Sequence, residues 1–173
     1  MEYYIGIDLG GTNIAAALVD GQGKILGRAN LATGAGRPAA EIAADMAHAG
    51  RRAAEQAGVP IEQVSAVGMG VPGPVTEDGT VLRCVNLGWD VFNIPQKVQE
   101  LERSIEKLRV ANDVNAATLG EMWQGGAQWN GSAVMVTLGP GIGSGIVVNN
   151  RIFEGCSGAA GEIGHMCVNP QET

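Results

Sequence analysis

Two polar residues, Asn112 and Asp113, end a short β-branched run and stand directly before an alanine-rich stretch in the segment RVANDVNAATLGE, residues 109–121. The first run predicts a strand, and the second predicts a helix that follows it at once. Open α/β sheets bind their ligands at the carboxyl ends of their strands. We therefore predict that Asp113 is the reactive carboxylate. It would also suit the N-cap of the helix, a role that is compatible with the first.

A glycine turn near the amino terminus joins two strand candidates and reads Asp8-Leu9-Gly10-Gly11-Thr12. Adjacent glycines allow backbone N–H groups to approach an oxyanion, and the hydroxyl of Thr12 adds a donor. Asp8, at the end of its strand, could hold Mg²⁺ through the water shell of the ion. The pattern predicts a phosphate site, and an ordinary hairpin turn is the alternative that this segment alone leaves open.

A second glycine-rich connection, TLGPGIGSG at residues 137–145, has a glycine at every second position. A strand-to-strand turn does not require so much glycine, so we predict that a phosphate approaches this backbone. Pro140 counts against this interpretation because proline has no N–H to donate. The predicted binding residues of this loop are Gly139, Gly141, Ile142 and Gly143.

Glu162 and His165 stand three residues apart in the segment GAAGEIGHM, residues 158–166. If this segment is helical, one turn places both side chains on the same face. There they could hydrogen-bond a polyol or act as metal ligands. A structural pair is the alternative, and the nearby Cys167 leaves a partial metal site open.

The elements that position these residues follow from the hydrophobic pattern. Apolar residues at helical spacing predict a helix from Pro38 to Ala57. Short turns between the first three strands predict an antiparallel meander. Two strands joined by a glycine turn occur twice in the sequence. This repetition indicates that the chain has two halves, each of which begins with a phosphate-binding hairpin. Strands are expected at 3–9, 13–20, 24–32, 64–70, 107–111, 133–138 and 145–148, and helices at 38–57, 94–104 and from Asp113 onward.

Composition limits the class of protein. The chain has 173 residues, of which 45% are hydrophobic, enough for one well-buried domain and the start of another. Its net charge of −7, from 11 basic and 18 acidic residues, predicts neither a nucleic-acid nor a membrane partner. The amino terminus has no leader pattern, so a cytoplasmic location is expected. The three cysteines have no C-x-x-C spacing and are expected to be free thiols.

Six motifs occur along the chain in a fixed order: DLGGT at 8–12, GVPGP at 70–74, NLGW at 86–89, NDVNAA at 112–117, the loop at 137–145 and GEIGH at 161–165. In this order they resemble the motifs of the ROK family of repressors, open reading frames and kinases. This resemblance implies an α/β fold of the actin-like, hexokinase-like ATPase class (ribonuclease H-like), with a mixed sheet. The first domain would span residues 1–118, and residues 119–173 would begin a second, similar domain. Residues 86–89 and 120–123 are most similar to bacterial glucokinases.

The resemblance implies ATP-dependent phosphorylation of a hexose, glucose to glucose 6-phosphate. Asp113 would be the general base that accepts the proton of the attacking sugar hydroxyl, and Asn112 would fix the sugar. Phosphoryl transfer depends mostly on positioning and charge stabilisation, which agrees with this arrangement. The remaining sugar contacts would come from Gly73, Asn86, Glu162 and His165.

The same resemblance implies ATP and Mg²⁺ as cofactors. Asp8 would lie near Mg²⁺, and the ATP phosphates would contact Gly10, Gly11, Thr12, Gly139, Gly141, Ile142 and Gly143. His165 would be a zinc ligand in the family. The cysteine motif that completes that zinc site does not occur in this sequence.

Two departures from the family pattern lead to further expectations. Pro140 replaces the usual threonine of its loop, and the family's zinc motif and second-domain adenosine pocket would come after Thr173. We therefore expect weak or no activity from this chain alone. The alternatives are a non-catalytic sugar-binding remnant and a sugar-responsive repressor that lacks its DNA-binding domain. Homo-oligomers would form if apolar surface is left uncovered.

Overall fold

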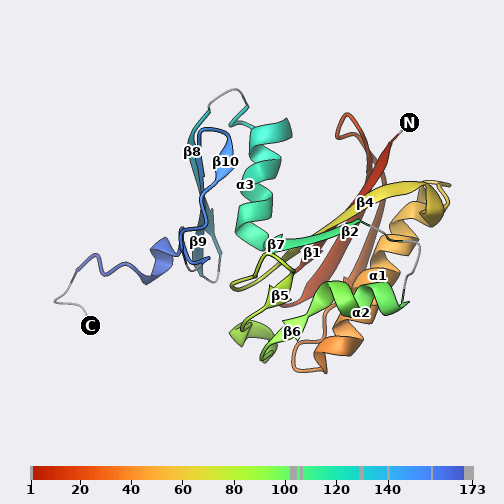
Figure 1. Ribbon diagram of the computed structural model, residues 1–173, viewed down its shortest axis with the longest axis horizontal. Coiled ribbons are helices and arrows are strands. Elements are labelled where there is room, and N and C mark those ends of the chain that lie inside the picture. Colours follow the sequence, from red (N-terminus) through yellow and green to blue (C-terminus); the bar gives the residue numbers. More distant parts are fainter. Residues whose placement is uncertain are drawn as a thin grey trace. The chain divides into compact units, whose positions relative to one another are not determined.

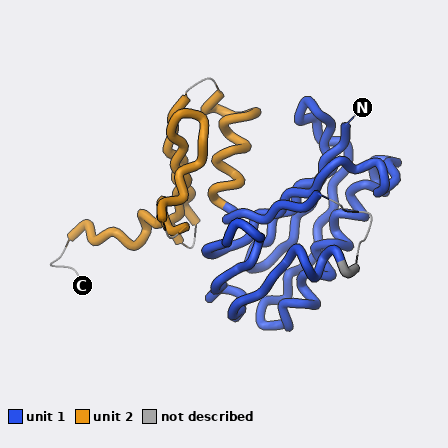
Figure 2. The backbone as a smooth tube through the Cα atoms, viewed as in Figure 1, with its two compact units in different colours: residues 1–113 blue, residues 114–173 orange. Residues whose placement is uncertain are grey.

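The computed structural model describes residues 2–101, 105, 107–128, 131–139, 141–156 and 158–169. It contains two compact units, Met1–Asp113 and Val114–Thr173, which are coloured separately in Figure 2. Each unit is described by itself. The sequence-based prediction places the start of the second domain at residue 119, and that assignment stays a prediction.

The first unit is built on a five-stranded mixed sheet with the order β3-β2-β1-β4-β7 (Figure 1). The antiparallel meander predicted for the first three strands is confirmed, since β2 pairs with both β1 and β3 in that sense. β4 pairs with β1, and β7 with β4, in parallel. The strands are β1 (Tyr3–Leu9), β2 (Asn13–Asp20), β3 (Ile25–Ala32), β4 (Val64–Val71) and β7 (Leu108–Asn112).

One face of this sheet carries the hydrophobic core. In β1, alternation buries Ile5, Ile7 and Leu9 and turns Gly6 and Asp8 to the other face. Helix α1 (Ala39–Gln56) contacts β1, β2 and β3, and α2 (Ile94–Leu101) contacts both α1 and β7. The helical spacing of apolar residues therefore matches the stripe of α1 that is buried against the sheet.

In the first unit, two short strands and two single turns of 3₁₀-helix were not predicted, and in the second unit the strand Arg151–Ile152 was not predicted either. The strands, β5 (Thr80–Val81) and β6 (Phe92–Asn93), are too short to show alternation; they pair with each other, and Val81 also forms an isolated bridge with Val75. The turns are η1 (Ile61–Gln63) and η2 (Val85–Leu87). The predicted helix 94–104 is described to Leu101, and residues 102–104 lie outside the described residues.

In the second unit, helix α3 (Asp113–Gln124) is followed by an antiparallel sheet of order β10-β9-β8. Its strands are β8 (Ala133–Leu138), β9 (Ile142–Val148) and β10 (Arg151–Ile152), followed by the single turn η3 (Ile163–His165). The strand predicted at 145–148 was wrong at its start, because β9 begins at Ile142 and pairs it with Leu138. Among the described residues, no helix has the length and apolar character needed to cross a membrane.

Candidate functional site

Asn112 and Asp113 lie where the parallel strands of the first unit end. Asn112 is the last residue of β7, and Asp113 is the first residue of α3, as the strand-to-helix pattern predicted. Both residues are half-buried. The register places Asn112 beside Val71 at the end of β4, and Gly70 of β4 beside Asp8 of β1. The carboxyl ends of three parallel strands therefore meet at one edge of the sheet.

The loop that follows β4 is tied to this edge. The side-chain Nδ2 of Asn112 donates a hydrogen bond to the carbonyl oxygen of Gly73, with a donor–acceptor distance of 3.3 Å. A side chain at Gly73 would collide with backbone, since its Cβ would lie 2.4 Å from the carbonyl oxygen of Arg83. The structure thus brings Gly73 and Asn112 together, although 39 residues separate them in the sequence.

Asn86 is presented by a short loop beside the same edge. Cys84 and Trp89 close this loop through two backbone hydrogen bonds of 3.1 and 3.0 Å. Leu87 and Trp89 are buried as anchors, whereas Asn86, which precedes Leu87 on η2, is exposed. A polar side chain carried on an anchored loop is well placed to meet a ligand.

The electrostatics of Cys84 link this loop to Asp113. Desolvation by burial raises the pKa of the Cys84 thiol. Hydrogen bonds from the backbone of Leu87 and Asn86 lower this pKa, and the negative charge of Asp113 raises it. The charge of Asp113 therefore acts on the thiol at the base of the loop that carries Asn86. Four of the predicted sugar-binding residues, Gly73, Asn86, Asn112 and Asp113, therefore gather in the first unit.

The first glycine turn is a closed hairpin with two open donors. The N–H of Gly10 donates to the carbonyl oxygen of Asn13 at 2.9 Å, so this group is used within the turn. Within the described part of the chain, the N–H groups of Gly11 and Thr12 have no backbone or side-chain acceptor, and both residues are exposed. The turn can therefore offer two adjacent donors to an anion.

Asp8 precedes this turn on the face of the sheet away from the core. More than a third of its surface is accessible, yet partial desolvation by its surroundings raises the pKa of its carboxyl. Desolvation disfavours the charged form of a carboxyl group. A nearby cation would reverse that effect, which is the arrangement expected next to a metal-bound phosphate.

The second glycine loop has a packing explanation for part of its composition. At Gly143 a Cβ would lie 2.9 Å from Val114, and at Gly145 it would lie 2.0 Å from the hydroxyl of Thr118. Glycine at these two positions lets β9 pack directly against α3. Among the described residues, the nearest neighbour of a Cβ at Gly139 would be the carbonyl oxygen of Gly141, at 3.9 Å, and a Cβ at Gly141 would meet nothing within 4 Å. These two positions therefore remain open for a ligand.

Ile142 and Pro140 complete the description of this loop. Ile142 is half exposed at the start of β9. Pro140, which we expected to weaken phosphate binding, lies outside the described residues. The phosphate-binding role of Gly139, Gly141, Ile142 and Gly143 stays a prediction.

Glu162 and His165 lie on one turn, as their spacing indicated. Nε2 of His165 is 3.9 Å from Oε2 of Glu162, and both side chains are exposed. The turn is held on β9 because the backbone N–H and the hydroxyl of Ser144 both donate to the carbonyl oxygen of Gly161, at 3.1 and 2.6 Å. The exposed pair can bind hydroxyl groups, and it belongs to the second unit.

Zinc does not fit the residues of this chain that the structure describes. Among them, no group of three or more His, Cys, Asp or Glu side chains could hold a metal ion. His165 therefore has no described partner set for a zinc site, and no role is derived through that metal.

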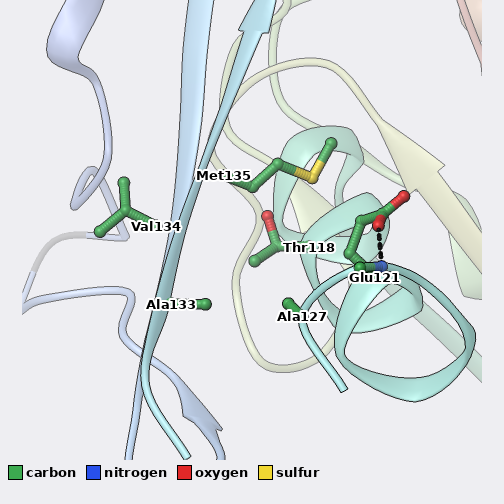
Figure 3. A pocket seen from close by; sticks show the side chains of 7 residues that line it. Thr118, Glu121, Ala127, Ala133, Val134 and Met135 are labelled. Atoms are coloured by element: carbon green, nitrogen blue, oxygen red, sulfur yellow. Dashed lines mark hydrogen bonds between the residues drawn. The ribbon is translucent and has the colours of Figure 1, made fainter. Parts of the chain in front are cut away.

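A shallow cavity of about 270 Å³ lies elsewhere in the second unit (Figure 3). It opens between the end of α3 and β8, and Met135 points into it from the strand. Its one carboxylate, Glu121, accepts a hydrogen bond of 2.9 Å from the N–H of Gly126 and so shapes the end of α3. None of the predicted site residues lines this cavity. Its lining residues are Thr118, Glu121, Gly126, Ala127, Ala133, Val134 and Met135.

Sequence reasoning missed one buried polar residue beside the first glycine turn. Thr33, just after β3, is fully buried and hydrogen-bonds to the turn from 23 residues away. A threonine followed by Gly-Ala-Gly-Arg-Pro marks an irregular segment, but no local pattern reveals which turn it contacts.

Curated relatives include both enzymes and regulators. The chain is 35% identical over 171 residues to a glucokinase of Halalkalibacterium halodurans, an alignment that covers 98% of this chain and 51% of the relative. It is 29% identical over 171 residues to the xylose repressor of Bacillus subtilis, covering 96% of this chain and 43% of the relative. The chain thus spans about half the length of the curated glucokinase that it matches.

A solved structure shows the same fold. A ROK family glucokinase from Streptomyces griseus, in complex with glucose and AMPPNP, is 37% identical and matches with a TM-score of 0.86. The match covers 97% of this chain and 51% of that chain. The predicted α/β class of actin-like, hexokinase-like ATPases is confirmed by this similarity. A family model described as "ROK family" matches residues 4–173, and the chain therefore belongs to the ROK family.

Proposed function

We propose that this chain is part of an ATP-dependent hexose kinase that converts glucose to glucose 6-phosphate, with Asp113 as its general base. The observation that carries the proposal is the grouping of Asp113 and Asn112 with the Gly73 loop and the Asn86 loop at the carboxyl edge of the sheet. The similarity to a glucokinase bound to glucose and AMPPNP, an ATP analogue, supports the choice of both substrates.

The chemistry assigned to Asp113 is proton acceptance. A half-buried carboxylate at the start of α3 would take the proton from the sugar hydroxyl as that oxygen attacks the phosphoryl group. Asn112 would hold the sugar through its amide, and the anchored loop would direct Asn86 to another hydroxyl. Glu162 and His165 are proposed to bind further hydroxyl groups from the second unit.

The cofactor residues fit ATP and Mg²⁺ in their donor chemistry. ATP, when bound, supplies the phosphoryl group, and Mg²⁺ offsets the charge of its oxygens. Gly11 and Thr12 have open N–H donors, and Gly139 and Gly141 leave space for close approach of a phosphate. Asp8 would hold the magnesium ion through water.

A substitution that removes the carboxylate but keeps the size of the side chain tests this proposal. Asp113 is the first residue of α3 and not the residue before the helix, and asparagine is nearly isosteric with aspartate but cannot accept a proton as a carboxylate does. Asp113→Asn should therefore leave the melting temperature nearly unchanged and lower turnover by roughly 10² to 10⁴. The measurement is coupled ADP release with glucose and a panel of hexoses, on a preparation whose intact mass has been verified.

A control variant and two possible results decide the test of Asp113. Glu62→Gln changes an exposed carboxylate of the same unit and should leave the rate unchanged. We expect the chain by itself to be weakly active or inactive, because it spans about half of the glucokinases it matches. Where turnover is measurable, an unchanged rate in Asp113→Asn would remove Asp113 from the mechanism. Turnover as fast as that of a typical kinase from this chain alone would contradict the expected weak activity.

The alternative is a sugar-responsive regulator or a non-catalytic protein that only binds sugar. The similarity to a xylose repressor supports this alternative. Such a protein would bind sugar without releasing ADP. Isothermal titration with glucose and with xylose, run beside the ADP assay, separates the two: saturable sugar binding in the absence of any nucleotide binding would favour the alternative.

A further inference from the structure

The segment that follows β3 braces the first glycine turn from behind. Thr33 is fully buried at the end of this strand. Its N–H donates to the carbonyl oxygen of Thr12 at 2.8 Å, and its hydroxyl donates to the carbonyl oxygen of Gly10 at 2.7 Å. One side chain and one backbone group of Thr33 thus hold two carbonyl groups of the same turn.

Arg37 hydrogen-bonds to the backbone of Thr33 and so fixes its position. Its Nη2 donates to the carbonyl oxygen of Thr33 at 2.7 Å and also lies 2.5 Å from the carboxylate of Asp45 on α1. The guanidinium folds back over Gly34, where a Cβ would lie 2.8 Å from Nε of Arg37. A continuous set of hydrogen bonds therefore connects α1, through Arg37 and Thr33, to the glycine turn.

This brace decides which groups of the turn face outward. The carbonyl groups of Gly10 and Thr12 are both engaged by Thr33, and the N–H of Gly10 is engaged by Asn13. The N–H groups of Gly11 and Thr12 are left exposed and without a described backbone or side-chain acceptor. Successive N–H groups held in this way form an anion-binding concavity.

We propose that Thr33 and Arg37 are positioning residues that hold the Gly10–Thr12 turn in its phosphate-binding conformation. The inference rests on the proposed function, because it takes the nucleotide phosphate as the ligand of this turn. Neither residue is proposed to contact the phosphate itself. A turn that is already formed binds more tightly than one that populates the same conformation only part of the time, and the apparent dissociation constant rises by the inverse of that population.

The test uses two variants of Thr33 with opposite expectations. Thr33→Val keeps the shape and the backbone N–H but removes the hydroxyl, which leaves the partly buried carbonyl of Gly10 without this donor. Thr33→Ser keeps the hydroxyl. The matched control is Thr118→Val, because Thr118 is also buried and also donates its hydroxyl to a backbone carbonyl, that of Val114, at 2.7 Å.

Two quantities are measured on the full 173-residue chain. The first is the dissociation constant of Mg·AMPPNP by isothermal titration, and the second is the amide hydrogen-exchange rate of Gly10 by NMR. Thr33→Val should raise the dissociation constant about tenfold, corresponding to a formed turn in about one molecule in ten. The amide of Gly10 should also exchange faster in this variant, because the turn is open more of the time. Arg37→Met should change both in the same direction, and Thr33→Ser should stay close to the wild type. Thr118→Val should lower the melting temperature and change neither quantity.

The outcomes separate this inference from the proposed function. If the wild type binds the nucleotide and Thr33→Val binds it equally well, the positioning role is overturned. If the wild type binds no nucleotide, the nucleotide site of the proposed function fails for this chain, and the exchange rate then decides the brace by itself. In that case an unchanged rate for Gly10 in Thr33→Val overturns the brace, and a faster rate supports it.

Discussion

Replacing Gly161 by alanine should loosen the turn that carries Glu162 and His165. Gly161 has a φ of +96°, a conformation that costs an L-residue of order 1–3 kcal/mol. The new Cβ would also lie 2.3 Å from the carbonyl oxygen of Ser144 in β9. Forcing extra volume against backbone costs typically 1–3 kcal/mol. Together, the two contributions predict that the free energy of unfolding falls by roughly 2–6 kcal/mol.

Denaturant unfolding followed by tryptophan fluorescence measures this loss. Gly120→Ala is the matched control, because it makes the same change on the exposed side of α3, where a Cβ meets nothing within 4 Å. That control should stabilise the protein by up to about 1 kcal/mol, since alanine is a better helix former than glycine. The amide of Ser144, which donates to the carbonyl oxygen of Gly161, should exchange faster in Gly161→Ala.

The reasoning would be refuted by a Gly161→Ala variant whose unfolding free energy stays within about 0.5 kcal/mol of the wild type. It would show that the contact between Gly161 and Ser144 does not hold the turn. A destabilised variant with undiminished glucose affinity would leave the packing argument intact and remove Glu162 and His165 from the proposed sugar site.

Two further predictions follow from the shifted pKa values. Because desolvation raises the pKa of Asp8, its ionisation opposes folding, so Asp8→Asn should have the higher melting temperature at pH 7 while binding Mg·AMPPNP more weakly. The difference in melting temperature should disappear as the pH falls below the ordinary pKa of a carboxyl, where both side chains are neutral; a difference that persists there would contradict this cause. Burial likewise raises the pKa of the Cys84 thiol, so iodoacetamide should alkylate the exposed Cys156 and Cys167 first, as followed by peptide mass spectrometry. Equal labelling rates at the three cysteines would show that Cys84 is not protected.

The long elements of the fold could be predicted because their signals are local. The alternation in Tyr3–Leu9 and the helical spacing in Ala39–Gln56 repeat over enough residues to exceed chance. The strands at Thr80–Val81 and Phe92–Asn93 have two residues each and no repeat to detect. They form because the chain folds back between β4 and α2, and only the tertiary structure contains that information.

The candidate site divides in the same way. Asp113, Asn112 and the glycine turn after Asp8 were predicted from residue type at the junction of elements. The glycines of the second loop were interpreted as ligand-binding, but the absence of side chains at Gly143 and Gly145 has a second cause in the helix that packs against them. A residue pattern does not distinguish close approach of a ligand from close approach of a helix.

By itself, the sequence determined the alternation that builds the sheet, the strand-to-helix junction at Asp113 and the ordered motifs of the ROK family. The tertiary structure decided which distant segments meet: Gly73 with Asn112, and Thr33 with the turn at Gly10. The physical reason is the range of the interactions. Periodicity and turn chemistry act between neighbours in the chain, whereas these hydrogen bonds join residues 39 and 23 positions apart. They form only after the hydrophobic core has placed the strands side by side.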